Sequence, residues 1–275
     1  MIFGGHRRIG KAVSTLLGVI ATIQIVSSNS SSDNPTSAST HIAGLIFSPA
    51  HAAESLQSGQ RPTKAQLSIY RGISLIQAGL LIADDLVKEH QWSDALAHLN
   101  LITAELNRLS EKHPDALDMA QFSDRLATLI SAVKGQYRIS YNQMVALAQE
   151  ELIKAFDKYK ATLPTPTTKL AISAANELLD LAATAYASSI EGGKFVDARK
   201  YQHSRGLISS AELIYVDYSV PLEKADLRSL GDIRMLINEI KGALRTTSPP
   251  DTPLLDTAKF RQNVVRIGQL STNYQ

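Results

Sequence analysis

The sequence contains no cysteine, so no disulfide can stabilise the fold in any compartment. It has one Trp, and Phe, Trp and Tyr together make up 6% of the residues, so aliphatic side chains must supply most of the core. We find no glycine-rich phosphate loop, no G-x-S-x-G nucleophile motif and no H-x-x-H ligand pair. These absences predict a protein that is not an enzyme and that holds no metal and no cofactor.

The charges give the chain no field of one sign. The first 52 residues hold three of the 28 Lys and Arg and one of the 26 Asp and Glu, which leaves 25 of each sign in the remainder. A binding partner rich in phosphate, such as nucleic acid or an anionic membrane surface, requires an excess of basic residues. We therefore expect no nucleic-acid partner, and contact with a membrane only through the N-terminal segment.

The N-terminal segment, residues 1–52, has the composition of an export leader. Arg7, Arg8 and Lys11 form a short basic cluster, and an apolar run follows at 12–26. This run has the length of a signal-peptide core and is shorter than the roughly 20 residues that a membrane-spanning helix needs. The pattern predicts export of the chain to the periplasm.

Small residues mark the predicted cleavage site of the leader. Ala50 and Ala52 match the small residues that signal peptidase accepts, which predicts cleavage between Ala52 and Ala53. The distance from the apolar run to this site is long for a signal peptide. Two alternatives remain open: a misassigned start or cleavage near Ser28, and an uncleaved leader that anchors the protein in the membrane. All three place the rest of the chain outside the cytoplasm.

Apolar residues recur at helical spacing in the rest of the chain. Steps of three and four residues place them on one face of a helix with 3.6 residues per turn. Only residues 88–91 separate the first two stripes, so these helices must be antiparallel neighbours, and Ser93 and Asp94 are candidates to cap the second one. The first two stripes are Ile69, Ile73, Ile76, Leu80, Ala83, Val87 and then Trp92, Ala95, Leu99, Ile102, Leu106, Leu109.

Further helices follow at similar spacing, and no strand alternation is present. A third is expected from Pro114 to Gly135, a fourth over 136–163, and a fifth that ends at Gly192-Gly193, because glycines often end helices. A sixth spans about 195–218 and a seventh reaches about 245. The prediction is an all-α antiparallel bundle over 53–248, followed by a C-terminal extension, 249–275, with a short helix.

Two helical hairpins of the sequence echo one another. H-Q-W-S-D-A-L-A resembles G-K-F-V-D-A-R-K, which pairs Trp92 with Phe195 and Asp94 with Asp197 at a separation of 103 residues. Tetratricopeptide-like repeats need a period near 34 residues. The period excludes a regular solenoid and leaves two interpretations open: two related helical hairpins in one bundle, or a pattern common to any helical hairpin.

The order of these segments resembles the YfdX family of exported helical proteins. The segments that carry the resemblance are R-G-I-S-L-I-Q-A-G-L-L-I-A with W-S-D-A-L, then G-G-K-F-V-D-A-R, and then Y-S-V-P-L at 218–222. The similarity covers about 63–245, and the chain departs from it in a longer leader, a longer middle at 112–165 and the extension past 246. The resemblance implies an all-helical envelope protein linked to stress, acid or drug tolerance, without catalytic residues to carry over.

The sixth helix contains the most distinctive polar stretch, R-K-Y-Q-H-S-R at 199–205. The pattern leaves two interpretations open: a solvent-facing segment, or a polar groove or subunit contact. Tyrosines beside basic residues can stack on and hydrogen-bond a ligand. The candidate ligand-binding residues are Arg199, His203, Tyr215 and Tyr218, and the other histidines of the bundle, including His98, are expected on the solvated surface.

Together these observations predict a non-enzymatic periplasmic helical binding or stress-tolerance protein of the YfdX type. It would bury a ligand or a partner segment between its helices, with a small molecule or another protein as the unidentified partner. Self-association through unused apolar stripes is compatible with the pattern. The alternative is a repeat-like helical adaptor for protein–protein interaction. The sequence leaves the ligand, the oligomeric state and the role of the extension open.

Overall fold

A computed structural model describes residues 62–163 and 167–275 and shows a helical protein. The predicted leader and the cleavage site at Ala52–Ala53 lie outside these residues. The helices are α1 (Lys64–Lys88), α2 (Trp92–Lys112), α3 (Ala120–Lys134), α4 (Arg138–Ala161), α5 (Thr168–Ser188), α6 (Ala198–Asp217), α7 (Ser219–Gly242) and α8 (Thr257–Ser271), with a 3₁₀ turn at Thr272–Tyr274 and two short strands, β1 (Ile190–Glu191) and β2 (Lys194–Phe195).

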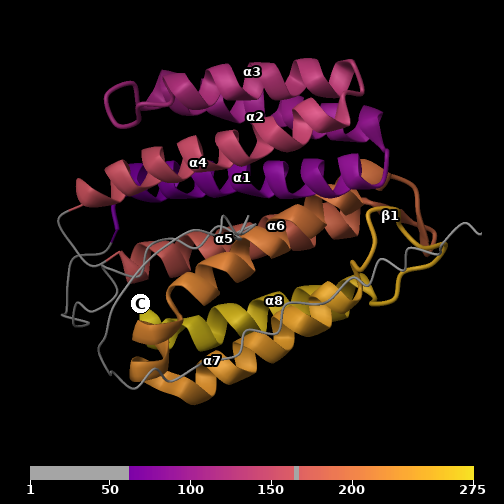
Figure 1. The fold of residues 1–275 in the computed structure, drawn as a ribbon. Coiled ribbons are helices and arrows are strands. Elements are labelled where there is room, and N and C mark those ends of the chain that lie inside the picture. The colour runs from indigo at the N-terminus through magenta and orange to yellow at the C-terminus, as the bar shows by residue number, and fades with distance from the viewer. Residues whose placement is uncertain (1–61, 164–166) are drawn as a thin grey trace, which may run out of the picture. The chain divides into compact units, whose positions relative to one another are not determined.

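The helices form two four-helix bundles that share one core. Figure 1 shows α1–α4 stacked on α5–α8, with α1 lying along α5 and α6. Within each bundle, consecutive helices pack as antiparallel neighbours, and the last helix returns to the first. The predicted all-α antiparallel bundle with helical hairpins is thereby confirmed. The arrangement differs from one single bundle, because α1 supplies packing surfaces to both sets of helices.

The predicted stripes form the buried face of the α1–α2 hairpin. All six apolar residues of the first stripe are buried, and in the second only Trp92 is half-exposed. Thr63 caps α1 with a reciprocal bond to Gln66. The prediction that Ser93 or Asp94 caps α2 is wrong, because the helix begins after Gln91 and has no side-chain cap. Asp94 instead accepts a hydrogen bond from another helix, as described below.

Two predicted helix boundaries are wrong. The third helix begins at Ala120 and not at Pro114, because residues 114–116 form a turn. The fifth helix ends at Ser188, before the glycines. Gly192 and Gly193, with φ of +57° and +76°, form the turn between β1 and β2. Their positive φ therefore serves a short hairpin and not a helix end. Asp197 then caps α6 by accepting a hydrogen bond from the Lys200 N–H at 3.1 Å.

The polar stretch of α6 is only partly solvent-facing, because Arg199 and Lys200 are exposed whereas Tyr201, Gln202 and Ser204 are buried. Its polar groups find partners in the neighbouring helices. The Ser204 hydroxyl donates to the Ala182 carbonyl at 2.9 Å, and the Ser210 hydroxyl donates to the Ser74 carbonyl at 2.9 Å. Arg205 donates to Asp85 at 2.6 Å. A buried polar group costs little once it is hydrogen-bonded, so these residues fasten α6 to α1 and α5.

The predicted C-terminal extension, 249–275, contains α8, which packs against α5 and α7 and completes the second bundle. Phe260 is fully buried, and its ring stacks on Tyr186 with 4.4 Å between the ring centroids. Among the described residues, α1 alone is long and apolar enough to cross a membrane by length and composition. Most of its apolar surface is buried against other helices, as in the core helix of a soluble protein.

Candidate functional site

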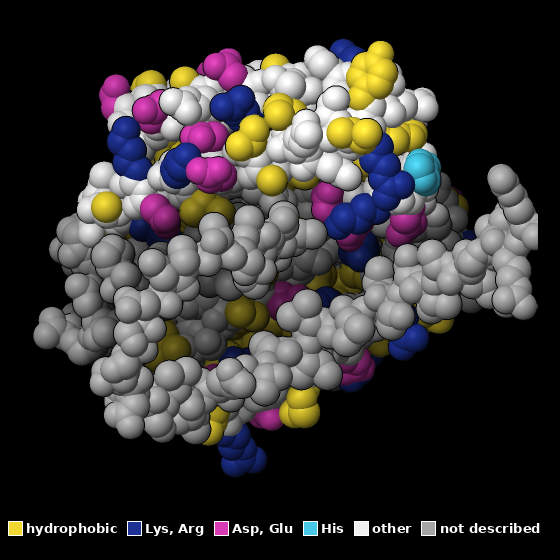
Figure 2. Space-filling view, viewed as in Figure 1, with side chains coloured by type: hydrophobic (Ala, Val, Ile, Leu, Met, Phe, Trp, Pro, Cys, Tyr) yellow, Lys and Arg dark blue, Asp and Glu magenta, His cyan; other side chains and the backbone are white. Residues whose placement is uncertain are grey.

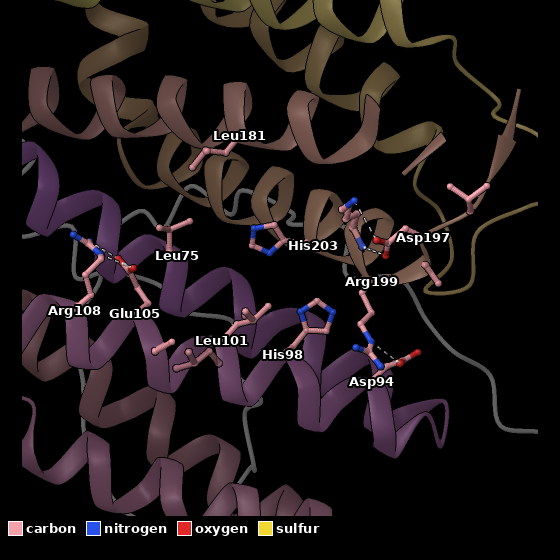
Figure 3. Close-up of a pocket in the computed structure, with 16 residues that line it drawn as sticks. Leu75, Asp94, His98, Leu101, Glu105, Arg108, Leu181, Asp197, Arg199 and His203 are labelled. Carbon is pink, nitrogen blue, oxygen red and sulfur yellow. Dashed lines mark hydrogen bonds and ion pairs between the residues drawn. The ribbon is translucent and has the colours of Figure 1, made fainter. Parts of the chain in front are cut away.

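A pocket lies at the junction of the two bundles. Its volume is about 860 Å³, which is in the range of sites for small organic molecules. The wall comes from α1, α2, α5 and the beginning of α6, and Figure 3 shows side chains of α2 and α6 pointing toward one another across the space. Because the hairpin turns position the first turns of α2 and α6, the pocket depends on both halves of the chain.

A chain of hydrogen bonds fixes the orientation of His98, which is 1% exposed. Asp94 Oδ2 accepts from Gln202 Nε2 at 3.1 Å, so the other end of the Gln202 amide is its oxygen. That oxygen lies 3.1 Å from His98 Nε2. An amide oxygen can only accept, so Nε2 of His98 carries the proton and Nδ1 carries a lone pair. Nδ1 is buried and has no hydrogen-bond partner in the protein.

His203 faces His98 from α6. The two ring centroids are 6.5 Å apart, and the ring planes differ by 16°. Burial, and to a smaller extent the nearby His98, lower the pKa of His203 to about 4. Burial also lowers the pKa of His98, against the opposing effects of Gln202 and Asp94. Both imidazoles are therefore neutral at pH 7, and each offers a nitrogen that can accept a hydrogen bond.

The charged side chains in the wall of the pocket pair with one another. Arg108 Nε donates to Glu105 at 2.7 Å, Lys200 lies 3.3 Å from Asp197, and Arg199 lies 3.7 Å from Asp94. The three basic and three acidic residues balance, so the wall has no net charge. The described surface in view in Figure 2 shows the same mixture of signs over the α1–α4 bundle.

The structure separates the four predicted ligand-binding residues. Arg199 and His203 line the pocket. Tyr215 lies in the core, where its hydroxyl is 2.7 Å from Ser271 Oγ and 3.1 Å from Asn176 Oδ1. The Tyr218 hydroxyl donates to Thr167 at 2.8 Å, far along α6 from the pocket. These two tyrosines hold α6 to α5 and α8 and do not reach the space between the imidazoles.

Sequence reasoning missed His98 and Gln202. His98 was expected on the solvated surface, which is wrong. The signal was present, because His98 follows Ala95 by three residues and precedes Ile102 by four, which puts it on the apolar face of its helix. Gln202 carried no signal, since its role depends on α2 and α6 meeting. Among residues 62–163 and 167–275, no group of three or more His, Cys, Asp or Glu is placed to hold a metal ion.

The neutrality of His203 can be measured directly. We expect an NMR titration of its imidazole resonances to show protonation near pH 4, well below the ordinary value of about 6.5. Between these two values the unfolded chain binds a proton that the folded chain does not, so this group's contribution to stability declines as the pH falls from about 6.5 to about 4. A midpoint near 6.5 would show that the ring is solvated and that the pocket is open in solution.

The second bundle has a counterpart among known families. Residues 164–274 match the Iron permease-associated 4-helix bundle domain. The match covers less than half of the chain and contains all of α5–α8, whereas α1–α4 lies outside it. Arg199 and His203 fall within the matched segment, and Asp94 and His98 fall outside it. Neither the curated proteins nor the solved structures that were compared contain a match to this chain.

This match overturns the resemblance to the YfdX family. Two of the segments that carried the resemblance, G-G-K-F-V-D-A-R and Y-S-V-P-L, lie inside the segment 164–274 that matches the other family. The residues of G-G-K-F-V-D-A-R are those that any tight helical hairpin uses: glycines in a turn, an aromatic residue and a capping Asp. The expected stress-tolerance function of the YfdX type is wrong with it.

Proposed function

We propose that the protein is an accessory component of an iron permease and takes part in iron uptake without catalysing a reaction. The match of residues 164–274 to the Iron permease-associated 4-helix bundle domain carries this proposal. Iron is the cargo of the permease in this scheme. The bundle α5–α8 is the part that associates with the permease, and α1–α4 is a second bundle attached to it through α1.

The surface of α7 supports a contact through the second bundle. This helix carries three large apolar side chains that are 50–64% exposed, Val220, Leu227 and Met235. Every other described helix has at most one large apolar side chain that is 50% exposed or more. Exposed apolar side chains that gather on one element favour contact with another protein. We therefore assign α7 to the interface with the permease.

The proposal also places the protein outside the cytoplasm, on the basis of the leader. Fractionation of cells followed by N-terminal sequencing tests this location. A mature chain that begins at Ala53, in the compartment outside the cytoplasmic membrane, is the expected result. A cytosolic chain that retains Met1 would exclude that location, and with it the proposed contact from outside.

Deletion of the gene should lower uptake of radioactive iron into iron-starved cells, and the full chain should restore it. Uptake of radioactive zinc in the same cells is the control for general damage to the envelope, and we expect no change. Normal iron uptake in the deletion strain would refute the proposal.

Two matched variants locate the contact. Leu227→Glu in α7 and Ile139→Glu in α4 each replace a large apolar side chain by a charged one. Both side chains are at least 64% exposed, so both variants should fold. We expect Leu227→Glu to reduce both iron uptake and co-purification with the permease after cross-linking, and Ile139→Glu to leave both unchanged. The reverse pattern would assign the contact to the first bundle.

A further inference from the structure

The pocket between the bundles has the features of a binding site, independently of any permease. One polar atom in its wall is buried and lacks a hydrogen-bond partner in the protein. His98 Nδ1 is buried with a lone pair and without a hydrogen bond, and the tautomer is fixed by Gln202. A buried acceptor without a hydrogen bond destabilises the protein, and a ligand that donates a hydrogen bond to it would remove this penalty.

His203 supplies further hydrogen-bonding nitrogens to the pocket. Its ring lines the pocket opposite His98 and is neutral at pH 7 because it is buried. A neutral imidazole has one nitrogen that donates and one that accepts. The two rings together thus present two acceptors and one donor to the same space (Figure 3).

The rest of the wall is apolar. Leu101, Leu181 and Val196 line the pocket and are 55%, 40% and 61% exposed, which is unusual for large apolar side chains. Leu75 and Ile102 close the inner side between α1 and α2. A ligand with an apolar body would cover these side chains and remove them from water.

The charges in the wall restrict the ligand further. Each of the three basic side chains is already paired with an acidic one, and the sum of their charges is zero. An anion would need a free basic group and a cation a free carboxylate, so the wall favours a ligand without net charge.

We propose that this pocket binds an uncharged organic molecule that has an apolar ring body and an N–H or O–H donor. The donor hydrogen-bonds the neutral imidazoles of His98 and His203, and the body packs against Leu101, Leu181 and Val196. The ligand thus bridges α2 and α6, and it joins the two bundles at their junction.

The test uses two probes of the same shape, indole and benzothiophene, on the full chain freed of its leader. Benzothiophene has sulfur where indole has its N–H donor. In an NMR titration, indole should shift the imidazole resonances of His98 and His203 and bind about fivefold more tightly than benzothiophene, the effect of one hydrogen bond. Benzoate, an anion of similar size, should not bind.

Variants assign the effect to the pocket. His203→Phe keeps the ring shape and should abolish the preference for indole, and His98→Phe should do the same. His113→Phe, which removes a histidine outside the pocket that lies 3.4 Å from Ser68, should bind like the wild type. Val196→Glu on the exposed rim should weaken the binding of both probes to the same extent. This variant tests the pocket without altering the core.

Three results would overturn the proposal. The first is that no probe binds. The second is equal binding of indole and benzothiophene, or a preference that survives both His203→Phe and His98→Phe. The third is that Zn²⁺ alone shifts the two imidazoles while indole does not, which would make the pair a metal site. Loss of indole binding would leave iron uptake as a separate observation, so the two proposals can fail independently.

Discussion

Replacement of Phe260 by Ala should lower the free energy of unfolding by about 3–5 kcal/mol. The side chain is fully buried and stacks on Tyr186, so truncation removes apolar surface from the core and leaves a cavity between α5 and α8. Tyr186 itself donates to the Leu255 carbonyl at 2.6 Å, so the cavity would also loosen the segment before α8. Urea unfolding monitored by circular dichroism measures the change.

Val265 on the same helix provides the control. It is 50% exposed, and Val265→Ala should change the free energy of unfolding by no more than about 0.5 kcal/mol. If Phe260→Ala cost as little as Val265→Ala, then α8 would not be part of the core, and residues 249–275 would be a dispensable extension.

Replacement of Gly206 by Ala should destabilise the protein by about 2 kcal/mol. A Cβ at this position would lie 2.6 Å from the carbonyl oxygen of Ala78, at the crossing of α6 and α1. A main-chain atom cannot move aside as a side chain can, so the helices must separate, at a cost of up to about 3 kcal/mol. The better helix propensity of Ala returns about 1 kcal/mol of this.

Gly231→Ala is the matched substitution, and it should change the free energy of unfolding in the opposite direction. Gly231 lies inside α7, and a Cβ there would meet no atom within 4 Å. Gly231→Ala should therefore raise the free energy of unfolding by up to about 1 kcal/mol through helix propensity alone. Thermal unfolding of both variants measures the pair. Stabilisation by Gly206→Ala would show that α1 and α6 are not in close contact in solution.

Much of the fold could be predicted from the sequence, because helical periodicity is a local property. The stripes of the first two helices became their buried faces, and the short connection at residues 88–91 became a tight turn. Large apolar residues just outside the helices behave differently, and Tyr137 and Leu254 are 64% and 62% exposed. Both lie beyond the ends of their helices, where the periodicity no longer determines which face is buried.

The candidate site was predicted only in part. Arg199 and His203 lie in the pocket, as their shared face of one helix allows. Tyr215 and Tyr218 follow on the same helix but point into contacts with α5 and α8. A single helix gives no information on which of its residues face a cavity, because that depends on the helices that pack around it.

The sequence by itself determined that this protein is built from antiparallel helices without disulfides, since the spacing of apolar residues and the absence of cysteine act within each segment. The tertiary structure alone decided that the helices divide into two bundles and that His98, Gln202 and His203 meet at their junction. The reason is physical: Asp94 and Gln202 are 108 positions apart in the chain, and only the packing of α1 against α5 and α6 brings the hydrogen-bonding groups of such distant residues within 3.1 Å.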